Sequence, residues 1–280
     1  MTISVAAVAA PFGRDLEAAF ALITDLVRDA RARGVRLLAL PEAALGGYLA
    51  DLSGDGAPDL PPALDVDGPE VARLAAIAGD MVVTAGFCES DGAQRYNTAV
   101  AVTGDGVLGV HRKVHQPLGE NASYAAGDGF RAFDSPVGRM GMLICYDKAF
   151  PESARTLAMD GAEVIACMSA WPAARTQSSP DLAEDRWTRR FDLFDQARAL
   201  ENQVVWLSAN QSGTFGSLRF VCSAKVVGPG GEVLATTGVG PGTAVAEVDV
   251  RSLLEGARRS MAHLRDRRPD AYGVLAGVGA

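Results

Sequence analysis

Apolar positions along the chain follow two different periods, one typical of strands and the other of helices. Ile3–Ala10 is an almost unbroken apolar run, which predicts a buried strand. From Asp15 onward the apolar positions recur with helical spacing as far as Ala30, and Gly34 is a natural stop for that helix. Val35–Leu40 predicts a second buried strand. A strand–helix–strand opening of this kind indicates an α/β fold with helices layered on a sheet.

The same alternation continues toward the C-terminus. Further helices are predicted at Glu70–Gly79, from Pro151 onward, at Arg186–Asn202 and near Arg251–Ala262. Further strands are predicted at Met81–Cys88, Thr98–Thr103, Val107–Val110, Met140–Cys145, Val164–Met168, Val204–Ala209, Phe220–Val227, Glu232–Thr236 and Ala244–Val248. Glycine-rich turns at 104–106 and 228–231 join some of these strands as hairpins. We expect a mixed sheet, or two sheets, covered by helices.

One domain is expected to span residues 1–280. The only long loop, Ser53–Gly68, lies too early in the chain to separate two domains of ordinary size. The chain is 48% hydrophobic and 21% charged, as in an ordinary globular protein, and its net charge of -8 argues against nucleic acid or an acidic membrane as partner. The apolar start lacks a basic flank, so it predicts a strand and not a signal peptide.

Cysteine and histidine usage limits the chemistry further. The four cysteines are far apart and form no C-x-x-C pair, which indicates reduced thiols in a cytoplasmic protein. Only three histidines are present, and His111 and His115 share one segment, so we expect no metal site.

Three chemically useful side chains follow predicted strands. Cys145 ends one apolar strand, Glu42 follows another after a proline, and Lys113 follows a third. Ligand sites of layered α/β proteins gather at such strand ends. Each residue also has an ordinary structural interpretation, as a buried thiol, a helix-capping carboxylate and a solvated ammonium respectively.

Taken together, the three side chains form a coherent nucleophilic site. A thiol is mostly protonated at neutral pH and needs a base, a role that Glu42 can take if it is buried. Lys113 would favour the thiolate of Cys145 and hold a developing oxyanion, with the backbone N–H of Tyr146 as a second donor. A Cys–His site built on His115 is the alternative, but the sequence shows no orienting residue for that histidine.

The segments around these residues resemble the carbon–nitrogen hydrolase (nitrilase) superfamily, with its Glu–Lys–Cys triad. The matching segments are Leu-Pro-Glu42 before two glycines, His111-Arg-Lys113-Val-His115, and Leu-Ile-Cys145-Tyr-Asp followed by Phe-Pro-Glu152. Glu120 matches the position where many members carry a second active-site glutamate, thought to position the lysine or the substrate amide.

This resemblance implies a four-layer α-β-β-α sandwich, assembled into homodimers or larger homo-oligomers. It also implies hydrolysis of a small amide-type substrate through an acyl-enzyme on Cys145, with no metal or organic cofactor. A catalytically weak member that serves as a binding or scaffold subunit is the alternative from another class.

The choice of substrate stays open at this point. Cys145-Tyr146-Asp147 resembles the amidase and carbamoyl-amidase branches more than nitrilases, which usually have Trp-Glu after the cysteine. Members that act on ω-amides often carry an arginine where this chain has Ala149, so Lys148 or Arg175 would have to replace it if the substrate were anionic. We therefore expect a small neutral amide first, an N-carbamoyl compound second and a nitrile third.

Overall fold

The opening strand–helix–strand unit forms as its apolar pattern predicts. The computed structural model of the chain describes residues 2–52 and 59–273 and begins with β1 (Ile3–Ala10), α1 (Leu16–Ala32) and β2 (Val35–Ala39). The side chain of Asp15 accepts a hydrogen bond from the backbone N–H of Ala18 and caps the first turn of α1. β1 and β2 are parallel neighbours, as a helical crossover requires.

A first half-sheet continues from this unit. Its strand order is β14, β1, β2, β3, β4, β5. The elements that complete it are α2 (Pro69–Ala78), β3 (Val82–Ser90), β4 (Arg95–Thr103), β5 (Gly106–Arg112) and β14 (Gly242–Val248). The predicted hairpin between β4 and β5 is confirmed, with Thr103 opposite Gly106.

A second half-sheet has the order β6, β7, β8, β9, β12, β13. Its elements are β6 (Phe133–Ser135), β7 (Gly138–Ile144), α3 (Pro151–Met159), β8 (Val164–Ser169), α4 (Arg186–Asn202), β9 (Val205–Gln211), β12 (Lys225–Val227) and β13 (Val233–Thr236). The two halves join where the end of β1 pairs with β9, at Ala9 opposite Asn210.

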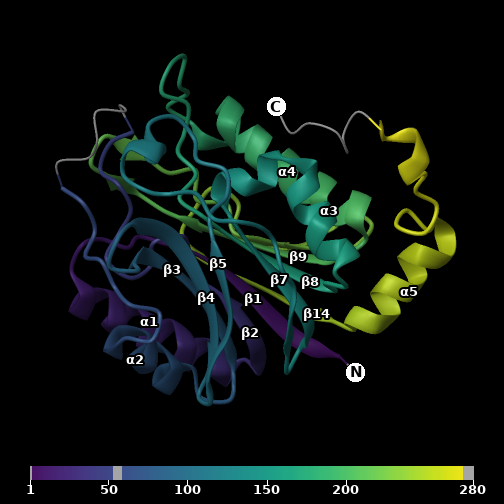
Figure 1. Cartoon of the computed structure of the whole chain (residues 1–280), viewed down its shortest axis with the longest axis horizontal. Helices are drawn as coiled ribbons and strands as arrows, with labels where there is room; N and C mark the ends of the chain where they lie inside the picture. The colour runs from purple at the N-terminus through teal and green to yellow at the C-terminus, as the bar shows by residue number, and fades with distance from the viewer. Residues whose placement is uncertain (1, 53–58, 274–280) are drawn as a thin grey trace.

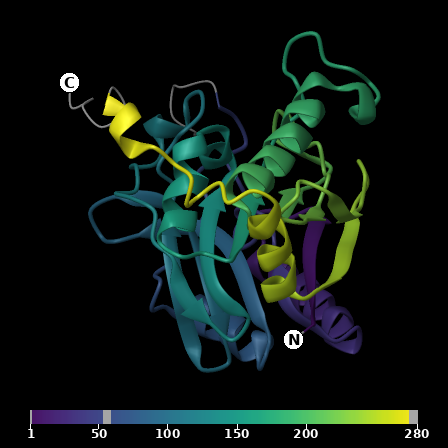
Figure 2. The same cartoon turned by 90° about the vertical axis from the view of Figure 1, so that its right-hand side faces the viewer.

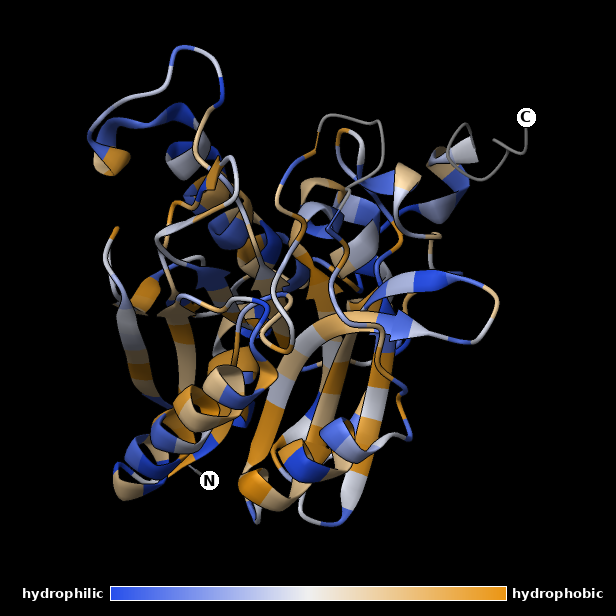
Figure 3. Ribbon diagram, turned by 90° about the vertical axis from the view of Figure 1, so that its left-hand side faces the viewer, coloured by the Kyte–Doolittle hydropathy of each residue, from blue (hydrophilic) through white to orange (hydrophobic). Residues whose placement is uncertain are grey.

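The two half-sheets lie face to face between the helix pairs α1/α2 and α3/α4 (Figure 1). Alternate residues of β1 accordingly face two cores. Ala6 and Val8 pack with the buried faces of α1 and α2, whereas Val5 and Ala7 pack with apolar side chains of β8 and β9. This arrangement confirms the α-β-β-α sandwich. Figure 3 shows the same layering as strands that are mostly apolar between helices of mixed hydropathy.

The C-terminal part lies outside these layers. Helix α5 (Val250–Ser260) follows β14, and the chain then runs along the outside of the molecule to the short helix η4 (Pro269–Ala271) (Figure 2). Among the described residues, none of the helices is both long and apolar enough to cross a membrane.

Two sequence-based expectations need correction or restriction. The predicted strand Phe220–Val227 is wrong over its first half, because Cys222 and Ser223 have positive φ angles of 61° and 57°, and only Lys225–Val227 forms β12. The predicted loop Ser53–Gly68 lies partly outside the described residues, and its described part, 59–68, contains no helix or strand.

Candidate active site

Glu42 lies in the turn that follows β2 and is fully buried, at 0% exposure. Gly86 of β3 makes this position possible, because a Cβ atom there would lie 2.6 Å from the backbone nitrogen of Ala43 and 3.0 Å from the Cα of Glu42. Nε2 of Gln211 donates a hydrogen bond of 2.9 Å to the backbone oxygen of Glu42. The capping role that the sequence allowed for Glu42 is therefore wrong.

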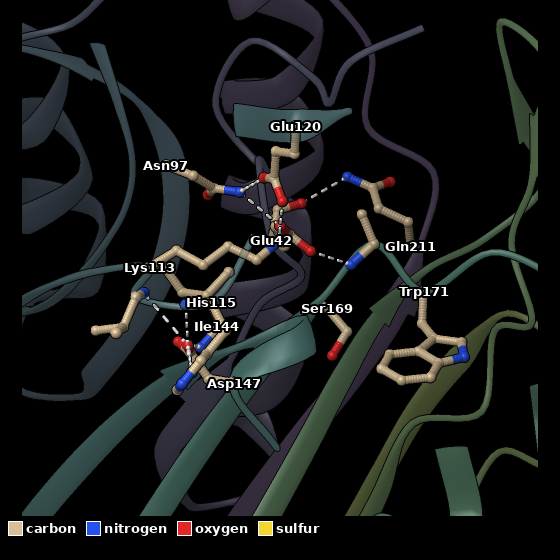
Figure 4. Close-up of polar contacts among 12 residues, drawn as sticks. Glu42, Asn97, Lys113, His115, Glu120, Ile144, Asp147, Ser169, Trp171 and Gln211 are labelled. Carbon is tan, nitrogen blue, oxygen red and sulfur yellow. Dashed lines mark hydrogen bonds and ion pairs between the residues drawn. The ribbon is translucent and has the colours of Figure 1, made fainter. Parts of the chain in front are cut away.

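Lys113 follows β5 and is also fully buried, so its interpretation as a solvated charge is wrong. Its backbone N–H donates to the oxygen of Asn97 at 2.8 Å, which extends the β4–β5 pairing by one more contact. Its Nζ lies 2.9 Å from Oε1 of Glu42 and 2.7 Å from Oε2 of Glu120, in the short helix η1 (Glu120–Ala122). The structure thus brings the two predicted glutamates together around one ammonium (Figure 4).

Asn97 links the same two carboxylates from β4. Its Nδ2 donates to Oε1 of Glu42 at 2.6 Å and to Oε1 of Glu120 at 2.7 Å (Figure 4). The other oxygen of Glu42 accepts from the backbone N–H of Ala170, just after β8. All partners of Glu42 are donors, so the contacts are those of a carboxylate. The sequence analysis did not identify Asn97, since an asparagine within a strand carries no signal of its own.

The charged groups of this cluster shift one another's pKa values. Burial alone would lower the pKa of Lys113, but attraction to Glu120 and Glu42 outweighs it and holds the pKa well above its ordinary value. Burial raises the pKa of Glu120, and the negative charge of Glu42 adds to that effect against the opposing charge of Lys113. The ammonium is therefore kept charged between two buried acids.

Cys145 follows β7 and begins the short helix η2 (Cys145–Ala149). Its φ angle of 50° is in the left-handed region that non-glycine residues rarely adopt, a conformation that costs about 1–2 kcal/mol. The residue is only 3% exposed, and burial, with the charge of Glu42 next, raises the pKa of its thiol well above the ordinary value. The resting thiol is therefore protonated and requires a base before it can act as a nucleophile.

Asp147, in the same short helix, joins the nucleophile's turn to the lysine segment. Its carboxylate lies 2.9 Å from Nε2 of His111 and 3.0 Å from Nδ1 of His115. It also accepts hydrogen bonds from the backbone N–H groups of His115 and Ile144 (Figure 4). Burial opposes ionisation, but the hydrogen bonds from the two histidines lower the pKa of Asp147 below its usual range. Asp147 is the orienting residue that the sequence did not reveal for His115.

Among the described residues, no hydrogen bond joins His115 to the thiol of Cys145. The ring of His115 stacks on Phe150, with centroids 3.7 Å apart, and its Nδ1 contacts Asp147. The histidine is thus held between an aromatic ring and a carboxylate.

A cavity of about 400 Å³ opens above Cys145. Apart from Cys145, Tyr146 and Arg190, its described lining is apolar or aromatic: Tyr48, Leu52, Pro117, Leu118, Ala149, Ala170, Trp171, Pro172, Trp187 and Phe194. A cavity of this size holds a small organic molecule and excludes much of the water around it.

The two cations considered as substitutes for an arginine at position 149 do not line this cavity. Lys148 is fully buried, and its Nζ lies 2.7 Å from Asp195, which also binds Nζ of Lys225 at 2.9 Å. Arg175 is exposed and lies at a separate surface hollow. Ala149 itself lines the cavity.

The buried thiol, carboxylate and ammonium form a set that can carry out acyl transfer. The carboxylate can accept the thiol proton, and the ammonium can stabilise negative charge on an attacked carbonyl or nitrile.

Similar proteins cover almost the whole chain. A nitrilase of Pyrococcus abyssi is 32% identical over 255 residues, which is 88% of this chain and 90% of that protein. An N-carbamoylputrescine amidase of Arabidopsis thaliana is 28% identical over 278 residues, covering 93% and 91% respectively.

Solved structures match equally broadly. A carbon-nitrogen hydrolase from Helicobacter pylori superposes with a TM-score of 0.85 at 24% identity, over 99% of this chain and 98% of that one. A mutant of a Nesterenkonia amidase from the nitrilase superfamily gives 0.78 at 25% identity, over 98% and 97%. The profile of the carbon-nitrogen hydrolase family matches residues 4–258. The chain is a member of the carbon-nitrogen hydrolase family.

Proposed function

We propose that this hydrolase is an amidase that releases ammonia through a thioester on Cys145. The observation that supports this most directly is the burial of Glu42 and Lys113 in contact with each other, beside a protonated thiol at the base of a cavity. A carboxylate beside the thiol can accept its proton, and a buried ammonium stabilises an oxyanion more than an exposed one does.

The reaction proceeds in two halves. Glu42 accepts the thiol proton as the sulfur of Cys145 attacks the amide carbon, and Lys113 with the backbone N–H of Tyr146 holds the oxyanion. The C–N bond then breaks, and the proton on Glu42 passes to the departing nitrogen, which leaves as ammonia. Water then gives a proton to Glu42 and attacks the thioester, so that the carboxylic acid leaves and the thiol regains its proton.

Glu120 and Asn97 have positioning roles in this proposal. Glu120 holds Nζ of Lys113 at 2.7 Å, and the amide of Asn97 donates to both glutamates and fixes their relative positions. No cofactor is needed for the chemistry, and the expected homo-oligomeric state stays a prediction.

Similar proteins carry the names nitrilase and N-carbamoylputrescine amidase, so three bond types have to be compared. We place amides first because Tyr146 and Asp147 follow the cysteine, N-carbamoyl compounds second and nitriles third. A binding or scaffold role without turnover is the alternative from another class.

The test is ammonia release from panels of aliphatic and aromatic amides, N-carbamoyl compounds and nitriles. Cys145→Ala should abolish release, whereas Cys167→Ala, which removes another buried free thiol, should retain it. Mass spectrometry after an acid quench should find the acyl group on Cys145 of the wild type. Turnover of none of the three classes would exclude the hydrolase and leave the binding role. Release by Cys145→Ala at the wild-type rate would exclude Cys145 as nucleophile.

A further inference from the structure

Arg190 has an unusual place in the cavity above Cys145. It lies near the start of α4, is exposed, and lines the cavity together with Trp187 and Phe194 of the same helix. Among the described residues of the lining, it alone carries a formal charge. A substrate in this cavity therefore meets apolar walls and a single cation.

The guanidinium of Arg190 has no partner among the described residues, unlike its neighbours on the helix. Arg189 forms an ion pair with Glu184, and Arg186 donates to Thr176 at 3.0 Å and to Gln177 at 3.3 Å. The unpaired state of Arg190 does not follow from a shortage of acids, because the chain has 34 acidic residues against 26 basic ones. Its charge is therefore available to a ligand in the cavity that the residue lines.

The walls define the rest of the ligand. Trp171, Tyr146 and Leu118 offer apolar surface and Ala149 leaves space, so the cavity of about 400 Å³ that Cys145 and Arg190 both line has room for an extended chain or a ring. A guanidinium recognises a carboxylate through two parallel hydrogen bonds. A neutral substrate would bury the apolar walls equally well but would leave this cation without a counter-charge.

Resting on the amidase function proposed above, we propose that Arg190 selects the substrate: an amide whose acyl part is an apolar chain or ring that ends in a carboxylate. This differs from the neutral amide expected from the sequence, an expectation that rested on Ala149 alone. Here the cation comes from α4 and not from the turn that carries the nucleophile.

The test compares two matched series of amides. One contains monoamides of unbranched dicarboxylic acids of increasing length, and the other contains unbranched alkyl amides of the same lengths. The wild type should show a higher kcat/KM for the acid series at one preferred length, by about tenfold. Raising the ionic strength should reduce this preference, since Arg190 is exposed.

Substitutions identify the residue responsible. Arg190→Gln should lower the ratio of the two kcat/KM values about tenfold, mainly through KM for the acid series, and Arg190→Lys should restore part of it. Arg189→Gln is the matched control, because Arg189 lies one position earlier and does not line the cavity; it should keep the wild-type ratio.

The outcomes separate this proposal from the one on which it rests. Cys145-dependent turnover of alkyl amides with no preference for any acid amide would overturn the role of Arg190 and leave the amidase standing. An Arg190→Gln enzyme with the wild-type ratio would do the same. Turnover of neither series by the wild type would overturn both proposals.

Discussion

The carboxylate of Asp147 accepts a hydrogen bond of 2.9 Å from the backbone N–H of His115 and lies 3.0 Å from the ring nitrogen of the same histidine. Asp147 belongs to the turn that Cys145 begins, and His115 lies two residues after Lys113. The thiol and the ammonium are thus held in relation to each other by a third, buried charge.

Asp147→Asn should destabilise the fold by about 3 kcal/mol, because it removes a buried charge and leaves its donors poorly paired. The pKa of Asp147 is lowered from an ordinary value of 3.8, so its ionised form stabilises the fold above about pH 4. That contribution is lost as the pH falls through the lower, folded pKa. Urea unfolding should show a constant difference between wild type and variant at neutral pH and a shrinking one in acid. A difference that grew in acid would contradict the assignment.

Replacing Asn97 should lower turnover even though Glu42, Lys113 and Cys145 are unchanged. Asn97→Asp places a third carboxylate beside Glu42 and Glu120, so kcat should fall by about a hundredfold or more. Asn121→Asp, an identical change at an exposed position within η1, serves as control and should retain activity. Steady-state kinetics with thermal unfolding will distinguish misplaced charge from loss of fold. Equal rates for the two variants would remove Asn97 from the site.

Substitutions of Glu42 and Lys113 should move the pKa of the Cys145 thiol in opposite directions. Glu42 raises the pKa of Cys145 and Lys113 lowers it, so Glu42→Gln should shift alkylation by iodoacetamide to lower pH and Lys113→Met to higher pH. Glu42→Gln should nevertheless reduce turnover by about a hundredfold or more, because the base is lost. Cys167 gives an internal control in the same mass spectra, since burial raises its pKa to about 12. Near-normal turnover by Glu42→Gln would refute its role as base.

His115→Ala separates the triad from a Cys–His mechanism. If the histidine only supports Asp147 and stacks on Phe150, kcat should fall less than about tenfold. His263→Ala, at a distant histidine near the C-terminal end, controls for the loss of an imidazole. Near-complete loss in His115→Ala alone would favour the Cys–His alternative.

The strand ends were the part of the site most accessible from the sequence. Glu42, Lys113 and Cys145 each follow a regular apolar run, and parallel layering brings such ends together. The helix Arg186–Asn202 was also predicted with its observed bounds. Position relative to a regular element is local information, and the sequence contains it.

What the sequence could not supply depends on contacts between distant segments. Asn97 lies inside β4, and its amide has a role in the site only because the fold brings Glu42 and Glu120, from other elements, within hydrogen-bond distance. The strand predicted from Phe220 failed because the backbone turns at Cys222 and Ser223, although their neighbours are apolar. Short β6, at Phe133–Ser135, is defined by its partner and not by a pattern of its own.

Gly86 carries no reactive group, yet substitutions at this position should abolish activity. Any side chain at this position would displace the turn that carries Glu42, since even a Cβ atom would lie 2.6 Å from the backbone of Ala43. A saturation scan selected on growth or turnover would therefore report Gly86 to be as intolerant as the acid that it neighbours. Selection for the reaction would therefore also retain Gly86, a residue that takes no part in the reaction itself.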